Sequence, residues 1–291
     1  MVSDFILLSF AWVIPYVLVV LVILWVFKLV YDKITHYDDD EQLRSNNLAV
    51  GLGRASMYIG VTLAMLGPAL SSERDFGWDL LMFAIEGIAA VAVMVFASVI
   101  FDKVILPHVD NRKAIGEGNL AVAVAESGAY IGLGFIMMSS LAGGSAPTLL
   151  QDIGSGLLFI VLGLGVLMGI YWIFVLLYKR FRKISVIEEI AAGNVAMAVE
   201  AGGVLVAMSI VLGCSIIGPF VDWWIDILGY LVAAVAGVLA LVIGQLISRR
   251  LFLPGGFVRE DGTHARNVAS ACINAAVVIS LGVVSGLVTL V

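Results

Sequence analysis

Five polar side chains stand inside stretches of the sequence that are otherwise apolar. They are Arg54, Glu86, Glu126, Glu200 and Asn274. An ionisable group inside an apolar, membrane-length segment is costly and marks a functional site by default. A carboxyl group buried there without a partner has a raised pKa, so it can load and release a proton, or coordinate a cation when it is ionised.

The surrounding composition is that of a membrane protein. Of the 291 residues, 62% are hydrophobic and 13% are charged, whereas a soluble chain carries about a quarter charged residues. The net charge is −6, whereas a nucleic-acid-binding protein needs a basic surface. A transmembrane helix needs about 20 mostly apolar residues, and eight such segments are predicted, at residues 5–31, 48–70, 80–101, 120–142, 153–178, 195–219, 227–250 and 268–291.

Lysine and arginine are distributed unequally between the two sides of these segments. Fourteen of the sixteen follow the first, third, fifth and seventh segments, whereas the opposite side has only Arg74. Cytoplasmic loops carry the excess of basic residues. We therefore expect a multi-pass protein of the bacterial inner membrane, with both termini on the periplasmic side.

A four-fold internal repeat underlies this pattern. The motif Asn-x-Ala-x-(Gly or Ala) begins at Asn47, Asn119, Asn194 and Asn267, at separations of 72, 75 and 73 residues. Each copy has two spans, so all copies have the same topology, and the repeats are parallel. The predicted fold is an all-α bundle of eight transmembrane helices in one membrane domain, with repeats at residues 1–70, 71–143, 144–219 and 220–291.

Small residues at four-residue spacing predict where the helices approach one another. The pairs are Ala49/Gly53, Ala121/Ala125, Gly128/Gly132, Gly165/Gly169 and Ala198/Gly202. Most lie on the second helix of a repeat, so we expect these second helices to form the tight centre of the bundle. Ser185 with Glu188, and Asp39 with Gln42, have capping-box spacing, which predicts that the second helices begin before the asparagine.

One linker resembles that of a known family. The stretch Tyr31-Asp-Lys-Ile-Thr-His36, followed by Glu41-Gln-Leu43 and Asn46-Asn-Leu-Ala49, is similar to the bacterial inner-membrane family catalogued as domain of unknown function 350. The resemblance covers the whole chain as four units, and the fourth departs from it at Pro254-Gly-Gly256. It implies repeated two-span units in the inner membrane, and no catalytic residues.

The polar residues of the second helices recur at one depth. Arg54, Glu126 and Asn274 come seven residues after their asparagines, and Glu200 comes six after its own. At 1.5 Å per residue this depth is about 10 Å along each helix. We expect a polar ring or cluster lining a path for protons or small cations, with Glu86 as a second station.

A structural interpretation stays open beside this one. Arg54 and Glu126 would then form a buried ion pair, and Glu200 and Asn274 would hydrogen-bond across neighbouring helices, because polar residues can hold membrane bundles together. The four repeated asparagines would tie the linkers to the bundle through their amides, or else line a vestibule.

The remaining expectations concern partners and chemistry. No zinc, phosphate-binding or hydrolase motif is present, and the linkers are too short for an enzyme domain, so we expect no enzymatic activity, no cofactor and no metal site; His36, His108 and His264 lack ligand spacing. The expected partners are the lipid bilayer, a homo-oligomer, or a cytoplasmic or membrane protein docked on the linkers. A non-transporting scaffold is the alternative to a conduit.

Overall fold

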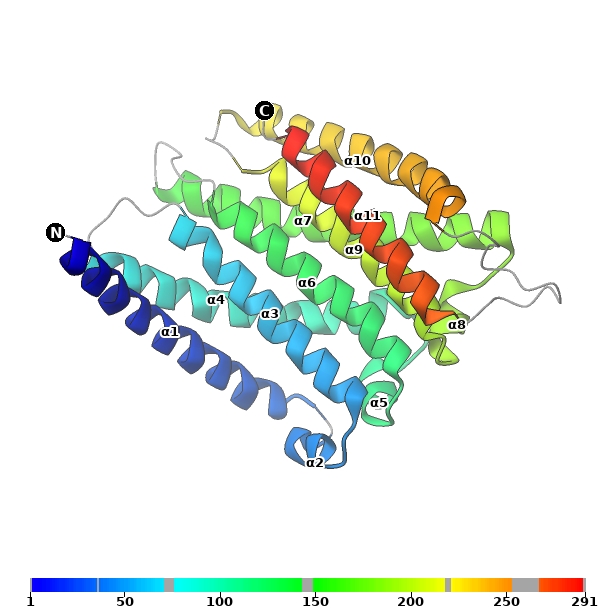
Figure 1. Ribbon diagram of the computed structural model, residues 1–291, viewed down its shortest axis with the longest axis horizontal. Helices are drawn as coiled ribbons and strands as arrows, with labels where there is room; N and C mark the ends of the chain where they lie inside the picture. Colours follow the sequence, from blue (N-terminus) through cyan, green and yellow to red (C-terminus); the bar gives the residue numbers. More distant parts are fainter. Residues whose placement is uncertain are drawn as a thin grey trace.

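The computed structural model describes residues 2–35, 37–70, 76–142, 149–217, 221–252 and 267–289, and over these ranges the chain is helical with no strand (Figure 1). The described part contains eight helices long and apolar enough to cross a membrane. This confirms the predicted all-α architecture. The long helices are α1 (Val2–Asp32), α3 (Leu48–Leu70), α4 (Phe76–Val104), α6 (Leu120–Ala142), α7 (Leu149–Leu177), α9 (Val195–Cys214), α10 (Trp223–Phe252) and α11 (Val268–Thr289).

The second helices of the four repeats form the centre, as expected, but they stand in a row. α6 packs between α3 and α9, and α11 packs on the far side of α9. The first helices cover this row: α4 contacts α3 and α6, α7 contacts α6 and α9, and α10 contacts α9 and α11. Figure 1 shows the row crossing the view, with the fainter α4 and α7 behind it.

A ring, one of the two arrangements expected for the polar residues, is therefore wrong. Each hairpin lies beside the preceding one, so α3 forms one edge of the row and α11 forms the other. Neighbouring packed helices have axes about 8–10 Å apart, and three such steps separate Arg54 on α3 from Asn274 on α11. A ring would have needed each repeat to rotate about a common axis, which the side-by-side packing does not do.

Glycines set the close spacing within the row. A Cβ atom on Gly128 of α6 would lie 2.4 Å from the Cα of Gly202 on α9, and one on Gly134 would lie 2.6 Å from the Gly60 oxygen on α3. This confirms Gly128 and Gly202 as contact positions. The predicted stripe Gly165/Gly169 is wrong, because a Cβ there meets no atom within 4 Å; small residues also occur on faces that no helix covers.

Three short helices precede the long helices of the row. They are α2 (Asp39–Arg44), α5 (Asn111–Gly116) and α8 (Val186–Ala191), capped by Asp38, Asp110 and Ser185. The expectation that the second helices begin before the asparagine is wrong, because a residue with positive φ separates each short helix from the long helix that follows. These residues are Asn46, Gly118 and Gly193. Ser185 thus caps α8 and not the long helix, and Asp39 is no cap.

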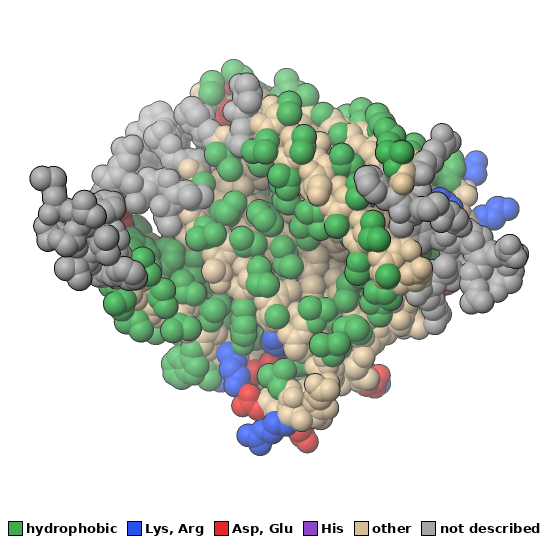
Figure 2. All heavy atoms as spheres, in the orientation of Figure 1, with side chains coloured by type: hydrophobic (Ala, Val, Ile, Leu, Met, Phe, Trp, Pro, Cys, Tyr) green, Lys and Arg blue, Asp and Glu red, His purple; other side chains and the backbone are tan. Residues whose placement is uncertain are grey.

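The surface has the two kinds of region that a membrane protein needs. Hydrophobic side chains cover most of the face drawn in Figure 2, and charged side chains gather at its lower edge, where α2 lies. We call this edge, with α2, α5 and α8, the short-helix end, and the edge where α1 begins and α11 finishes the terminal end.

Candidate functional site

The four repeated asparagines cap the helices of the row. The Asn47 Oδ1 accepts hydrogen bonds from the Ala49 and Val50 amides at 3.1 and 3.3 Å. Asn119 does the same for the start of α6, Asn194 accepts from Met197 and Asn267 accepts from Ser270. The first backbone N–H groups of a helix have no carbonyl partner within the helix. An asparagine at this position accepts their hydrogen bonds with its side-chain oxygen.

The amide nitrogens of two of them bind the next repeat. Asn47 Nδ2 donates to the Gly116 oxygen of α5 at 2.9 Å, and Asn119 Nδ2 donates to the Ala191 oxygen of α8 at 2.9 Å. Asn194 instead donates to Glu189 within its own repeat at 2.8 Å. One side chain thus starts a helix and attaches the neighbouring short helix, which places the repeats side by side.

Asn119→Ala removes both functions, whereas Asn119→Ser keeps a capping oxygen but cannot reach Ala191. We expect Ala to lower the free energy of unfolding by about 1–2 kcal/mol, and Ser to restore the capping part only. Denaturant unfolding in mixed micelles measures both. Equal stability of the Ala and Ser variants would contradict a capping role.

The first repeat places a buried ion pair beneath its short helix. Asp39, the first residue of α2, accepts hydrogen bonds from Nε and Nη2 of Arg54 on α3. Both side chains are buried, Asp39 with 3% and Arg54 with 6% of its surface exposed. The guanidinium also lies 4.0 Å from the centre of the Tyr31 ring, a cation–π contact. Arg54 therefore pairs with Asp39, and the hypothesis of an Arg54–Glu126 pair is wrong.

The second repeat uses the same two positions with different chemistry. Asn111 is the first residue of α5, and its Nδ2 donates to Glu126 Oε1 at 2.8 Å. The Tyr130 hydroxyl donates to the other carboxylate oxygen at 3.4 Å. Glu126 is 4% exposed, and the hydrogen bonds described for it come from two neutral groups.

These two sites are joined into one chain of polar groups. Tyr130 donates to Glu126, and the Tyr31 ring lies against the Arg54 guanidinium. An electrostatic interaction between the two tyrosines links the Arg54–Asp39 pair with Glu126 and Asn111. We call these six residues the paired-repeat network. Beside it, burial raises the pKa of Tyr37 to about 12, so this linker hydroxyl remains neutral at physiological pH.

The third repeat breaks the pattern. The positions that correspond to Asp39 and Arg54 are the apolar Val186 and Ala201. Glu200 instead accepts a hydrogen bond from the hydroxyl of Tyr178, which stands where Tyr31 stands in the first repeat. Asn274 is buried on α11, and the linker before it, residues 253–266, lies outside the described residues.

Glu86 stays apart from the other predicted site residues. It is half-buried on α4, 16 residues before Asp102 at the short-helix end, or about 24 Å along the helix. Among the histidines, His108 is exposed, and His36 and His264 lie outside the described residues. Within the part of the chain that the structure covers, no group of three His, Cys, Asp or Glu side chains has the geometry to hold a metal ion.

Sequence reasoning missed Asp39, Asn111 and the tyrosines of the network. A signal for the first two existed, because each precedes its asparagine by eight residues and its partner by fifteen. The tyrosines had a similar signal, because Tyr31 and Tyr178 both stand sixteen residues before their asparagines, and Tyr130 stands eleven after its own, as Tyr58 does.

Comparisons with known proteins agree with these observations. The family described as Domain of Unknown Function (DUF350) matches residues 5–141 and 148–288, which meet between α6 and α7. A "UPF0719 transmembrane protein" of Aquifex aeolicus (strain VF5) is 23% identical over 270 residues, covering 89% of this chain and 96% of the relative. No solved structure matches the chain. The chain therefore belongs to the DUF350 family, and it is a multi-pass integral membrane protein built from tandem units.

Proposed function

We propose that this protein carries protons across a bacterial inner membrane, with Glu126 as the group that takes up and releases the proton. The observation that supports the proposal is the contrast between two equivalent sites. Asp39 has a guanidinium partner, whereas the hydrogen bonds described for Glu126 come from an amide and a phenol. A buried carboxylate without a bonded cation is stabilised by taking up a proton.

The surroundings of Glu126 suit a proton better than a metal cation. Calcium needs six to eight oxygen ligands, and magnesium a near-ideal octahedron. The groups that contact the Glu126 carboxylate are an amide nitrogen and a hydroxyl that both donate to it. An amide nitrogen is no ligand for these cations, and one carboxylate with one hydroxyl falls short of six oxygen ligands.

The network also offers a route to the short-helix end. Tyr130 and Tyr31 lead from Glu126 toward the Arg54–Asp39 pair and the linker behind it. Hydroxyl groups both donate and accept hydrogen bonds, so they can pass a proton along. Glu86 lies in the half of α4 that is nearer the terminal end. We propose it as the second group that binds the proton on that side.

Glu126→Gln tests the proposal, because glutamine keeps the shape of the side chain and cannot ionise. We expect proton flux into liposomes containing the purified protein, read with an entrapped pH-sensitive dye, to fall at least about a hundredfold, the low end for a removed proton-transfer group. The matched control is Glu117→Gln, an exposed carboxylate in the linker just before α6, which should leave flux unchanged. Undiminished flux in Glu126→Gln would refute the role of Glu126.

A second candidate function is a non-transporting scaffold whose linkers bind a protein partner. The observation that favours it is the pairing of Arg54 with Asp39 and of Glu200 with Tyr178, since such contacts are also what a purely structural network needs. Liposomes with wild-type protein that pass protons no faster than empty liposomes would favour this candidate over the conduit.

The proposed orientation has the short-helix end in the cytoplasm and both termini in the periplasm. It rests on the fourteen basic residues at or beside that end. Alkaline phosphatase fused after Val291 should be active, and the same enzyme inserted after Glu117 should be inactive, because the reporter folds only in the periplasm. The reverse pattern would invert the topology.

A further inference from the structure

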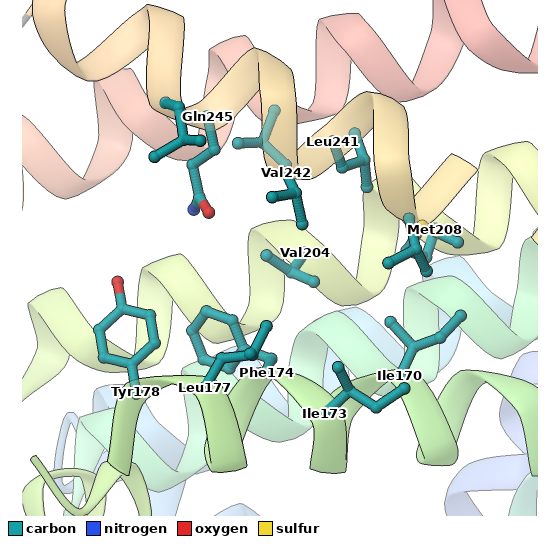
Figure 3. A pocket seen from close by; sticks show the side chains of 13 residues that line it. Ile170, Ile173, Phe174, Leu177, Tyr178, Val204, Met208, Leu241, Val242 and Gln245 are labelled. Atoms are coloured by element: carbon teal, nitrogen blue, oxygen red, sulfur yellow. The ribbon is translucent and has the colours of Figure 1, made fainter. Parts of the chain in front are cut away.

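An apolar groove opens between α7 and α10 at the short-helix half of the bundle. Its cavity volume is about 130 Å³, and its walls come mainly from α7, α9 and α10, with Val278 of α11 (Figure 3). Ile173 and Leu177 form one wall, Val204 and Met208 the floor, and Val242 the opposite wall. The lining is apolar except at one end.

Polar groups mark that end of the groove. Figure 3 shows the hydroxyl of Tyr178, the residue that follows α7, and the Gln245 amide on α10 at the same end, directed into the gap from opposite walls. The Tyr178 hydroxyl also donates to Glu200 at this level. A molecule lying along the groove would therefore meet apolar side chains over its length and polar groups at one end.

A basic turn follows this polar end directly. The helix α7 continues as one π-helical turn, η1 (Tyr178–Arg182), which carries Lys179, Arg180 and Arg182, all of them exposed. None of the ion pairs found among the described residues involves them. These three cations are thus available at the mouth of the groove.

The groove is specific to the second half of the chain. Counted from the repeated asparagines, Val242 corresponds to Met94 and Gln245 to Ala97. Met94 and Ala97 are fully buried in the first half, whereas Val242 is 40% exposed. The same fold therefore closes this space in one half and leaves it open, with an amide added, in the other.

We propose that the groove binds an anionic phospholipid, with an acyl chain between α7 and α10 and the phosphate headgroup on Lys179, Arg180 and Arg182. The apolar walls match the hydrocarbon chain, and the polar end and the basic turn match the glycerol and phosphate groups in the order in which they occur in a lipid. Arginine and lysine beside a membrane attract anionic headgroups.

The first experiment tests the binding of the acyl chain by filling the groove with a larger side chain. Val242→Trp places an indole in it, and Val235→Trp places one on the exposed face of α10, outside the groove. In native mass spectrometry of protein released from nanodiscs with equal phosphatidylglycerol and phosphatidylethanolamine, we expect wild type and Val235→Trp to retain one phosphatidylglycerol, and Val242→Trp to lose it. Retention by Val242→Trp overturns the groove as the site; Ile173→Trp repeats the test from the opposite wall should Val242→Trp fail to fold.

The headgroup test removes the charges. Each basic residue near a membrane surface contributes about a fivefold preference for an anionic lipid, so the variant Lys179→Gln/Arg180→Gln/Arg182→Gln should lose roughly a hundredfold in preference for phosphatidylglycerol. Lys113→Gln, an exposed cation on α5, is the control and should keep it. Equal retention of both lipids by the wild-type protein would overturn the anionic assignment.

Discussion

Replacing Asp39 with alanine should lower the free energy of unfolding by about 3–5 kcal/mol, because the variant leaves a guanidinium buried without its carboxylate. Arg54 is inside the bundle between α3 and the short helix α2, and its remaining contacts are with the Tyr31 and Tyr37 rings and the Met57 sulfur. None of these three side chains carries a negative charge, and the nearby Asp32 carboxylate interacts more strongly with Asp39 than with Arg54. Denaturant unfolding in mixed micelles, followed by circular dichroism, measures the loss.

Two further variants separate the ion pair from other effects. In Asp39→Leu/Arg54→Met both charges are absent, so stability should return to within about 1–2 kcal/mol of the wild type. Asp40→Ala removes the neighbouring Lys28–Asp40 pair, in which Lys28 lowers the pKa of Asp40; this pair is exposed to solvent, so no measurable change is expected. If the double variant is as unstable as Asp39→Ala, the buried charge is not the cause.

Gly128→Ala should destabilise the protein by about 2–3 kcal/mol, although it adds only one methyl group. That methyl carbon would lie 2.4 Å from the Cα and 2.7 Å from the carbonyl oxygen of Gly202. Both are backbone atoms of α9, so the contact is relieved only by separating α6 from α9. Thermal unfolding in detergent, monitored by the loss of monodisperse protein, reports this change.

Gly53→Ala is the matched control for this effect. Gly53 is also in the row, on α3, but a Cβ atom there meets nothing within 4 Å. Alanine is the better helix former, so this variant should be neutral or stabilising by up to about 1 kcal/mol. A similar loss in both variants would mean that helix propensity, and not the distance between α6 and α9, limits stability.

The row itself was only partly predictable. The pairs Gly128/Gly132 and Gly165/Gly169 have the same four-residue spacing, yet only the first pair lies at a close helix contact. In lipid, helices associate through close packing rather than through the hydrophobic effect. A small-residue stripe therefore says that two helices can approach, without saying which ones.

The candidate site shows the same division. The depth of Arg54, Glu126 and Glu200 follows from counting along the repeats, and they do lie on neighbouring helices of the row. Their partners do not follow, because the short helices fold back under the row. This brings Asp39 to Arg54 and Asn111 to Glu126, where the sequence suggested contacts between the long helices.

The amino-acid sequence alone determined the number of spans, the four repeats and the asparagine at the start of each second helix. These features depend on the length of apolar segments and on local spacing, which are properties of the chain itself. The tertiary structure decided that the repeats form a row, that Arg54 is paired while Glu126 is held by neutral donors, and that a groove opens between α7 and α10. The physical reason is that these outcomes depend on which helix faces meet, and in a chain this uniformly apolar many faces are chemically alike, so only the fit of close-packed side chains distinguishes them.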